Sequence, residues 1–213
     1  MYANDNSVFL SVETEKLNNN STDYVIISDV DGISTGIQNV NLKAWNAKAV
    51  KALDEQRKAG ELPAEVARVY DDLKKLGYAP DAANTNIGSA IFANKPGDGS
   101  AREQAASCQK VLGGFANICY EFATKRYRSN CINWGILPFT LDAGTSFDYA
   151  PGDCVFVPGI RQAIENGIED IPARVIRTDG AVEDLMLHVK GLTDDEKEII
   201  LDGCLMNYYA KRN

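Results

Sequence analysis

Three short apolar runs alternate with two amphipathic segments between residues 86 and 141. Residues 86–93, 115–122 and 136–141 have the length and composition of buried strands, whereas residues 101–112 and 124–134 resemble helices. Strands separated by helices usually pair in parallel through right-handed crossovers. This stretch therefore predicts an α/β fold with a mixed, largely parallel sheet and flanking helices.

The segments on either side extend the same pattern within a chain of 213 residues. Apolar alternation predicts further strands at residues 8–13, 24–28, 153–157, 172–177 and 184–189. Helices are expected at residues 41–59, 64–76 and 160–166, with Pro63 at a first helical position. A capping box at Thr193 begins the last expected helix, whose apolar stripe is Leu201, Cys204, Leu205 and Tyr208.

Charge and cysteine content exclude several classes of protein. The net charge of −8 argues against a nucleic-acid partner, and no run approaches the roughly 20 apolar residues of a membrane span. The five cysteines form no C-x-x-C pair, so neither a disulfide framework nor a metal site within the chain is expected. Three cysteines could in principle hold a cluster, but reduced buried thiols in a cytoplasmic protein are the favoured interpretation.

A glycine turn between an expected strand and helix is the first candidate site. Residues 97–102 read Gly-Asp-Gly-Ser-Ala-Arg, which places Ser100 and Arg102 at a helix start. The helix amides and the arginine would favour an anion, and a serine held there could act as a base. The alternative is a plain helix cap by Ser100. The segment is not a nucleotide P-loop, since no Lys-Ser/Thr follows the glycines.

Asp29, Asp31 and Ser34 form a second candidate, in a turn after the expected strand at residues 24–28. An EF-hand loop starting at Asp29 would need a glutamate where Val40 stands, so a calcium site is excluded. The two carboxylates could orient a partner arginine or share a proton. Ordinary turn chemistry is the alternative.

The remaining titratable candidates give weaker signals. His188 is the only histidine and lies in an apolar alternating run, which favours a structural role and makes a Ser-His-Asp hydrolase improbable. Lys125, Arg126 and Arg128 form a small basic cluster. Solvated helix surface is the simpler interpretation, although one of the three could face the glycine turn.

Four motifs resemble the aconitase superfamily, in the order in which they occur there. Residues 97–105, Gly-Asp-Gly-Ser-Ala-Arg-Glu-Gln-Ala, resemble its Gly-x-Gly-Ser-Ser-Arg-Glu-His-Ala motif. Residues 129–138, Ser-Asn-Cys-Ile-Asn-Trp-Gly-Ile-Leu-Pro, resemble its Ala-Asn-Leu-Ile-Asn-x-Gly-Ile-Leu-Pro. Residues 31–34, Asp-Gly-Ile-Ser, resemble its Asp-His-Ile-Ser turn, and residues 203–209 resemble its terminal helix.

The resemblance implies the swivelling β/β/α domain that closes over an iron–sulfur domain or large subunit. Residues 24–213 would form this domain, with residues 1–23 as a linker or N-terminal extension. By resemblance, Ser100 is the base that removes a substrate proton, Arg102 binds a substrate carboxylate, and Asp31 and Ser34 belong to the polar network. A [4Fe-4S] cluster is expected in the partner, where it would accept the leaving hydroxyl, and not in this chain.

The sequence also departs from the family pattern. Ala101 replaces the second motif serine, Gln104 the motif histidine and Gly32 the turn histidine, and the family's downstream arginine has no counterpart. These departures favour an aconitase-like hydratase acting on another hydroxy-carboxylic acid over one acting on citrate. The alternative function is a non-catalytic carboxylate-binding or regulatory module of the same fold.

Overall fold

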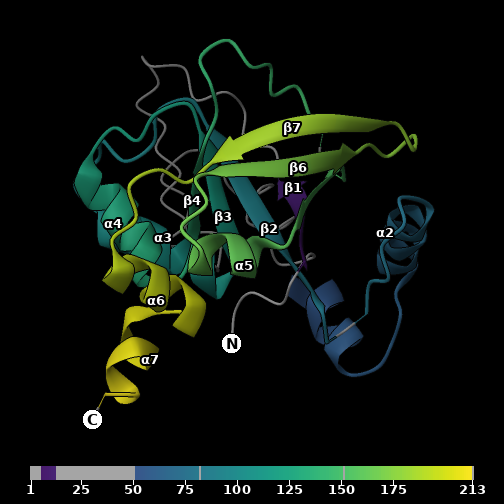
Figure 1. Ribbon diagram of the computed structural model, residues 1–213, viewed down its shortest axis with the longest axis horizontal. Helices are drawn as coiled ribbons and strands as arrows, with labels where there is room; N and C mark the ends of the chain where they lie inside the picture. The colour runs from purple at the N-terminus through teal and green to yellow at the C-terminus, as the bar shows by residue number, and fades with distance from the viewer. Residues whose placement is uncertain (1–5, 13–50, 82, 151, 213) are drawn as a thin grey trace, which may run out of the picture.

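The computed structural model describes residues 6–12, 51–81, 83–150 and 152–212 (Figure 1). Seven strands of this described part form a closed barrel in the order β1-β2-β3-β4-β7-β6-β5. They are β1 Asn6–Val12, β2 Thr85–Ala93, β3 Gly114–Cys119, β4 Leu137–Thr140, β5 Cys154–Pro158, β6 Asp170–Ile176 and β7 Val182–His188. The expected strand at residues 24–28 and the turn with Asp29, Asp31 and Ser34 lie outside the described residues.

The barrel has a parallel part and an antiparallel part. Strands β1 to β4 pair in parallel, in sequence order. The pairs β1–β5, β5–β6, β6–β7 and β4–β7 are antiparallel. The mixed α/β fold is therefore confirmed, and its parallel part contains the strands that alternate with helices in the sequence.

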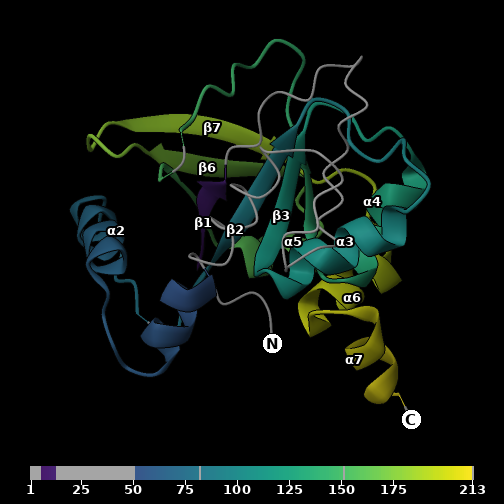
Figure 2. The same ribbon diagram turned by 180° about the vertical axis from the view of Figure 1, so that it is seen from behind.

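The helices surround the barrel, and most of them form two groups. Their bounds are α2 Ala64–Lys75, α3 Arg102–Val111, α4 Lys125–Asn133, α5 Ile160–Glu165, α6 Asp194–Asp202 and α7 Leu205–Ala210, and residues 51–58 are also helical. Helices α3, α4, α6 and α7 gather on one side of the barrel and α2 lies on the other, as the two opposite views show (Figures 1 and 2).

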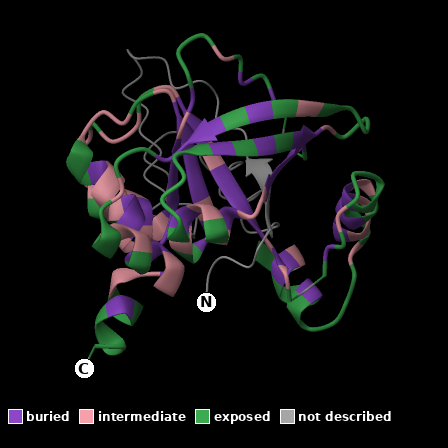
Figure 3. Ribbon diagram, in the orientation of Figure 1, coloured by how far each residue is buried: buried purple, intermediate pink, exposed green. Residues whose placement is uncertain are grey.

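Strand β5 is buried on both faces, which explains its unbroken apolar sequence. Val155 and Val157 belong to the main core, together with side chains of β2, β3, β4, β6 and β7. Cys154 and Phe156 instead pack with one face of α2. Burial of one such large apolar side chain contributes about 2–3 kcal/mol. Figure 3 shows this core as the buried colour that runs through the strands.

The C-terminal segment forms two helices, and the prediction of one continuous helix from Thr193 was wrong. The capping box at Thr193 is present, but α6 ends at Gly203, whose φ of 90° is left-handed. Cys204 is then the N-cap of α7. Glycine adopts this conformation without the steric cost of a side chain, so it ends the helix even though the apolar stripe continues.

Helix α2 begins at Ala64, as predicted, but the position assigned to Pro63 was wrong. Pro63 is the N-cap residue, with φ −55° and ψ 150°, and not the first helical residue. Its ψ is extended, as expected for an N-cap, whose backbone has not yet entered the helix.

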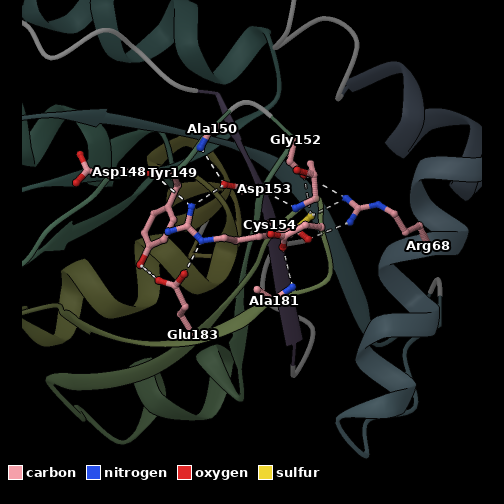
Figure 4. Close-up of polar contacts among 12 residues, drawn as sticks. Arg68, Asp148, Tyr149, Ala150, Gly152, Asp153, Cys154, Ala181 and Glu183 are labelled. Carbon is pink, nitrogen blue, oxygen red and sulfur yellow. Dashed lines mark hydrogen bonds and ion pairs between the residues drawn. The ribbon is translucent and has the colours of Figure 1, made fainter.

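Polar contacts among charged side chains and one tyrosine join strands of the antiparallel part (Figure 4). We call these residues the Asp153 cluster: Arg68, Tyr149, Asp153, Arg177 and Glu183. The Asp153 carboxylate is buried and accepts the N–H groups of residues 150 and 178, both at 2.9 Å. Arg177 pairs with Glu183 and lies over the Tyr149 ring at 4.9 Å. Arg68 of α2 donates to the Gly152 carbonyl at 3.2 Å, so the cluster also joins α2 to the barrel.

Candidate functional site

The glycine turn lies at the edge of the barrel where the parallel strands end. The turn follows β2 directly, and the loop after β3 contacts it. The Tyr120 and Glu121 N–H groups donate to the Asn94 carbonyl at 3.2 and 3.3 Å. The Ala123 N–H donates to the Pro96 carbonyl at 2.8 Å, and Lys95 pairs with Glu121 at 2.7 Å. These bonds end β3 earlier than the expected strand at residues 115–122 and attach its loop to the turn.

Gly97 is required by both backbone conformation and space. Its φ is +97°, which L side chains rarely adopt. A Cβ added there would lie 2.4 Å from the Tyr127 Cβ, so the turn rests directly on α4. The Gly97 carbonyl accepts the Thr124 hydroxyl at 3.1 Å, and Thr124 is itself the N-cap of α4.

Buried polar groups fix Tyr127 beneath the turn. The Gln109 amide nitrogen donates to the Tyr127 hydroxyl at 2.8 Å, and Asn117 donates to the Gln109 oxygen at 2.9 Å. Asn117 also contacts the Cys131 sulfur at 3.1 Å. Burial raises the pKa of Tyr127 well above its usual value, so the phenol stays neutral. Buried polar groups need partners, and this chain of contacts supplies them from α3, β3 and α4.

Ser100 is not the helix cap. The N-cap of α3 is Ala101, without a side-chain cap, and Ser100 precedes it as an exposed residue. Within the described residues, the Ser100 hydroxyl has no hydrogen-bond partner. The capping alternative is therefore wrong, and the hydroxyl is presented to solvent beside a helix N-terminus.

Arg102 lies beside Ser100 and braces the turn. Its Nε donates to the Gly97 carbonyl at 2.8 Å and its Nη2 to the Asp98 carbonyl at 3.3 Å. A guanidinium carries five N–H groups, so these two contacts leave others for a ligand. Ser100 and Arg102 thus lie two residues apart in the sequence at the start of α3, whereas Asp31 and Ser34 lie outside the described residues.

Asn130 and Trp134, from the second motif, contact the start of α3, a role that the sequence did not reveal. With the Asn130 oxygen facing an N–H group, it accepts the Glu103 N–H at 2.9 Å, and its nitrogen donates to the Glu103 carboxylate at 3.3 Å. The Trp134 indole donates to the other Glu103 oxygen at 2.5 Å. The signal in the sequence was that both motifs match the same family in the same order.

The second motif also contacts the C-terminal one. Gly135 has φ +62°, and a Cβ there would lie 2.0 Å from the Gly203 carbonyl oxygen. The turn after α4 therefore packs against the junction of α6 and α7. Three of the four motifs thus form one continuous group, running from the glycine turn through α4 to Gly203.

His188 lies outside this group, whereas the three basic residues belong to α4. The His188 ring is buried between Asp170, 2.7 Å from Nδ1, and Asp142, 3.3 Å from Nε2. His188 also forms the β4–β7 pair, a position in the barrel wall that fits the expected structural role. Arg128 pairs with Glu196 of α6 at 3.4 Å, whereas Lys125 and Arg126 are exposed.

Four of the five cysteines of this chain are poorly suited as ligands of an iron–sulfur cluster. Cluster ligands are thiolates, but burial raises the pKa of the Cys131 and Cys154 thiols to about 12. Burial also raises the pKa of Cys108 and Cys119. In the described ranges, no three His, Cys, Asp or Glu side chains are grouped to hold a metal ion.

The family follows from a sequence match. Residues 11–144 match the aconitase C-terminal domain family. This chain belongs to that family. The match includes the glycine turn, the Asn130 motif and the strands that carry them, and it confirms the resemblance found in the sequence.

Relatives in the aconitase family include whole enzymes and a small subunit. A putative mitochondrial aconitate hydratase of Emericella nidulans is 31% identical over 67% of this chain, which spans 19% of that protein. The 3-isopropylmalate dehydratase small subunit of Metallosphaera sedula is 34% identical over 58% of this chain and 66% of its own length. A crystal structure of 3-isopropylmalate dehydratase (leuD) from Methanocaldococcus jannaschii is 29% identical, with a TM-score of 0.40, over 60% of this chain and 65% of that one. Among the described helices of this family member, none is long and apolar enough to cross a membrane.

Proposed function

We propose that this chain is the swivel domain of an aconitase-like hydro-lyase acting on a hydroxy-carboxylic acid. Its relatives are named as hydratases and dehydratases, which supports this reaction class. The observation that carries the proposal is the exposed Ser100 beside Arg102, at the N-terminus of α3. A serine with no partner in the described residues, next to a positive field, suits a base that acts on an anionic substrate.

Arg102 would bind a carboxylate of the substrate. Its contacts with the turn carbonyls hold the guanidinium in place, which lowers the entropy cost of ligand binding. Its remaining N–H groups can form charge-assisted bonds with the carboxylate oxygens. In this proposal Asp31 and Ser34 complete the polar network, as the resemblance implies.

Ser100 would remove a proton from the substrate carbon. The hydroxyl first gives up its own proton to solvent water, which the exposure of Ser100 allows, and the alkoxide formed is stabilised by Arg102 and the α3 amides. The alkoxide then takes the carbon-bound proton, and the electron pair of the broken C–H bond forms the double bond as the substrate hydroxyl leaves. In the hydration direction, Ser100 returns the proton to carbon.

The group that receives the leaving hydroxyl would come from another domain or subunit. The described residues contain no group of three metal-ligating side chains, which supports a partner as the holder of a [4Fe-4S] cluster. This chain would supply the base and the carboxylate site when the partner closes on it. The isolated chain is therefore expected to be inactive.

The test is Ser100→Ala in the complex with the cluster-bearing partner. The assay follows the ultraviolet absorbance of the unsaturated product with a panel of hydroxy di- and tricarboxylic acids. Loss of the base should lower kcat by about 10²–10⁴-fold, because general bases contribute this much. Ser146→Ala is the matched control, since Ser146 is an exposed serine of the loop after β4. Full activity in Ser100→Ala would exclude the assignment.

A further inference from the structure

We propose that Asn130 is a positioning residue of the site, which acts through the N-terminus of α3. The inference rests on the proposed function for its catalytic consequence, but its structural part concerns α3 alone. Asn130 belongs to α4 and lies next to neither Ser100 nor Arg102 in the sequence. Its contact with Glu103 connects the two motifs that the family shares.

The first step concerns the helix cap. A helix begins with N–H groups that have no partner within the helix, and a polar residue at the N-cap usually accepts one of them. Ala101 has no side chain that could do so. Asn130 accepts the Glu103 N–H at 2.9 Å instead, so α3 is capped from a neighbouring helix.

The second step concerns the Glu103 side chain. Its carboxylate accepts the Asn130 amide at 3.3 Å and the Trp134 indole at 2.5 Å, one at each oxygen. The Asn130 nitrogen also faces the Arg126 carbonyl at 3.1 Å, which fixes the orientation of the amide. Main chain and side chain of Glu103 are thus both held by α4.

The third step concerns Ser100 and Arg102. Glu103 directly follows Arg102, so its attachment to α4 sets where α3 starts and how the turn before it is aimed. Asn130 also occupies the Glu103 N–H, which leaves the amides nearer to Ser100 for an anion. A displacement of about 1 Å in a catalytic group can lower the rate by about 10²-fold. Asn130 therefore controls catalysis without contact with the substrate.

The test compares two caps of the same protein. Asn130→Ala removes the cap that α3 receives from α4, whereas Thr193→Ala removes the cap of α6. In the complex with the iron–sulfur partner, Asn130→Ala should lower kcat about 10- to 100-fold and leave KM within about threefold. Thr193→Ala should leave both constants within about twofold. Equal losses of kcat in the two variants would overturn the inference, because a general loss of stability would then explain both.

Exchanging the amide of residue 130 with the carboxylate of residue 103 tests whether their contact restores kcat. Asn130→Asp alone places a second carboxylate against Glu103 and should be at least as impaired as Asn130→Ala. Combining Asn130→Asp with Glu103→Gln restores one donor and one acceptor across the contact, and retains an acceptor for the Trp134 indole. The double variant should have a higher kcat than Asn130→Asp but a lower one than the wild type, because the Arg126 carbonyl then faces an oxygen instead of the Asn130 nitrogen. A double variant with the same kcat as Asn130→Asp would overturn the inference.

Hydrogen exchange separates this inference from the proposed function. In the full chain without partner or substrate, Asn130→Ala should speed exchange of the Glu103 N–H by about tenfold, while exchange of the Glu196 N–H stays unchanged. Thr193→Ala should do the reverse, because Glu196 N–H donates to Thr193 at 3.2 Å. An unchanged Glu103 rate in Asn130→Ala would overturn the positioning role. Faster exchange in a protein whose partner complex has no hydro-lyase activity would instead reject the proposed function alone.

Discussion

The parallel and antiparallel parts of the barrel use their polar side chains differently. In the antiparallel part, the charged side chains of the Asp153 cluster are partners of one another and of nearby main chain. In the parallel part, Arg102 and Thr124 donate to the carbonyl of the glycine turn, and Asn130 accepts an N–H of α3. The second arrangement holds the main chain in place and leaves Ser100 exposed.

Under the proposed function, this difference would separate stability from catalysis within one small barrel. A carboxylate buried among its own partners stabilises the fold but has no capacity for a ligand. In the glycine turn, side chains of α3 and α4 hold the main chain, so the Ser100 hydroxyl is not needed to hold the turn. We therefore expect changes in the Asp153 cluster to affect unfolding, and changes around the glycine turn to affect turnover.

The strongest test of this separation is Gly97→Ala. The new Cβ would overlap Tyr127 and would require a left-handed residue, so the turn must move. We expect kcat of the partner complex to fall at least about 100-fold, because the positions of Ser100 and Arg102 relative to the substrate would change. The free energy of unfolding should fall by about 2–4 kcal/mol from overlap and backbone strain.

Gly144→Ala is the matched control for this change. Gly144 also has a positive φ, +92°, in the loop after β4, but an added Cβ would meet nothing within 4 Å. Only the backbone cost of about 1–2 kcal/mol should appear, with kcat unchanged. Similar kcat losses in both variants would show that turnover depends on backbone strain in general. The overlap with Tyr127 would then not be the cause of the loss in Gly97→Ala.

The second test is Asp153→Ala in the antiparallel part. Removal of the carboxylate leaves the N–H groups of residues 150 and 178 without their acceptor and Arg177 without one of its partners. Unfolding in urea should show a loss of about 2–3 kcal/mol. The kcat of the complex should stay within about twofold, at a temperature where the variant is folded.

Asp153→Asn sharpens this result, because the amide keeps one acceptor oxygen. Its loss of stability should be smaller than that of Asp153→Ala. A large fall in kcat in either variant, without a comparable fall in Gly97→Ala, would reverse our assignment of stability and function to the two parts.

The sequence predicted the strands well because each depends mainly on its own apolar pattern. Strand β5, for example, is apolar at every position from Cys154 to Val157, and the structure buries both of its faces. The parallel pairing of β2, β3 and β4 followed from the helices between them. The interruption at Gly203 was missed because an apolar stripe does not show where the backbone turns left-handed.

The site was only partly predictable because its supports come from other elements. Ser100 and Arg102 were proposed as site residues from a local motif at a helix start. The contact of Asn130 with Glu103 depends on how α4 packs beside α3, which no local pattern reveals. Likewise, the sequence placed Gly97 in the candidate turn, but only the packing shows that Tyr127 lies against it.

Lys110 offers a smaller test, at the opposite end of α3 from the site. It donates to the Gly135 carbonyl at 3.3 Å and lies 5.2 Å from the centre of the Phe115 ring. Burial lowers the pKa of its amine to about 7, against about 10.4 in an unfolded chain. Here an amine in the parallel part contacts a carbonyl and a ring, which distinguishes it from the paired charges of the Asp153 cluster.

The sign of the pH effect follows from these two pKa values. Below pH 7 the amine is charged in both states, so the folded protein bears the full cost of a buried charge. Between pH 7 and about 10.4 the folded amine is neutral while the unfolded one still binds a proton, so stability rises with pH.

Buried thiols such as Cys131, whose pKa is raised, act in the opposite direction above their unfolded pKa, so the effect must be measured as a difference. Relative to Lys110→Met, the wild type should gain up to about 1.4 kcal/mol of unfolding free energy between pH 8 and 9. Parallel pH profiles for the two proteins would show that Lys110 keeps an ordinary pKa, and that this end of α3 is as well solvated as the exposed faces of the barrel.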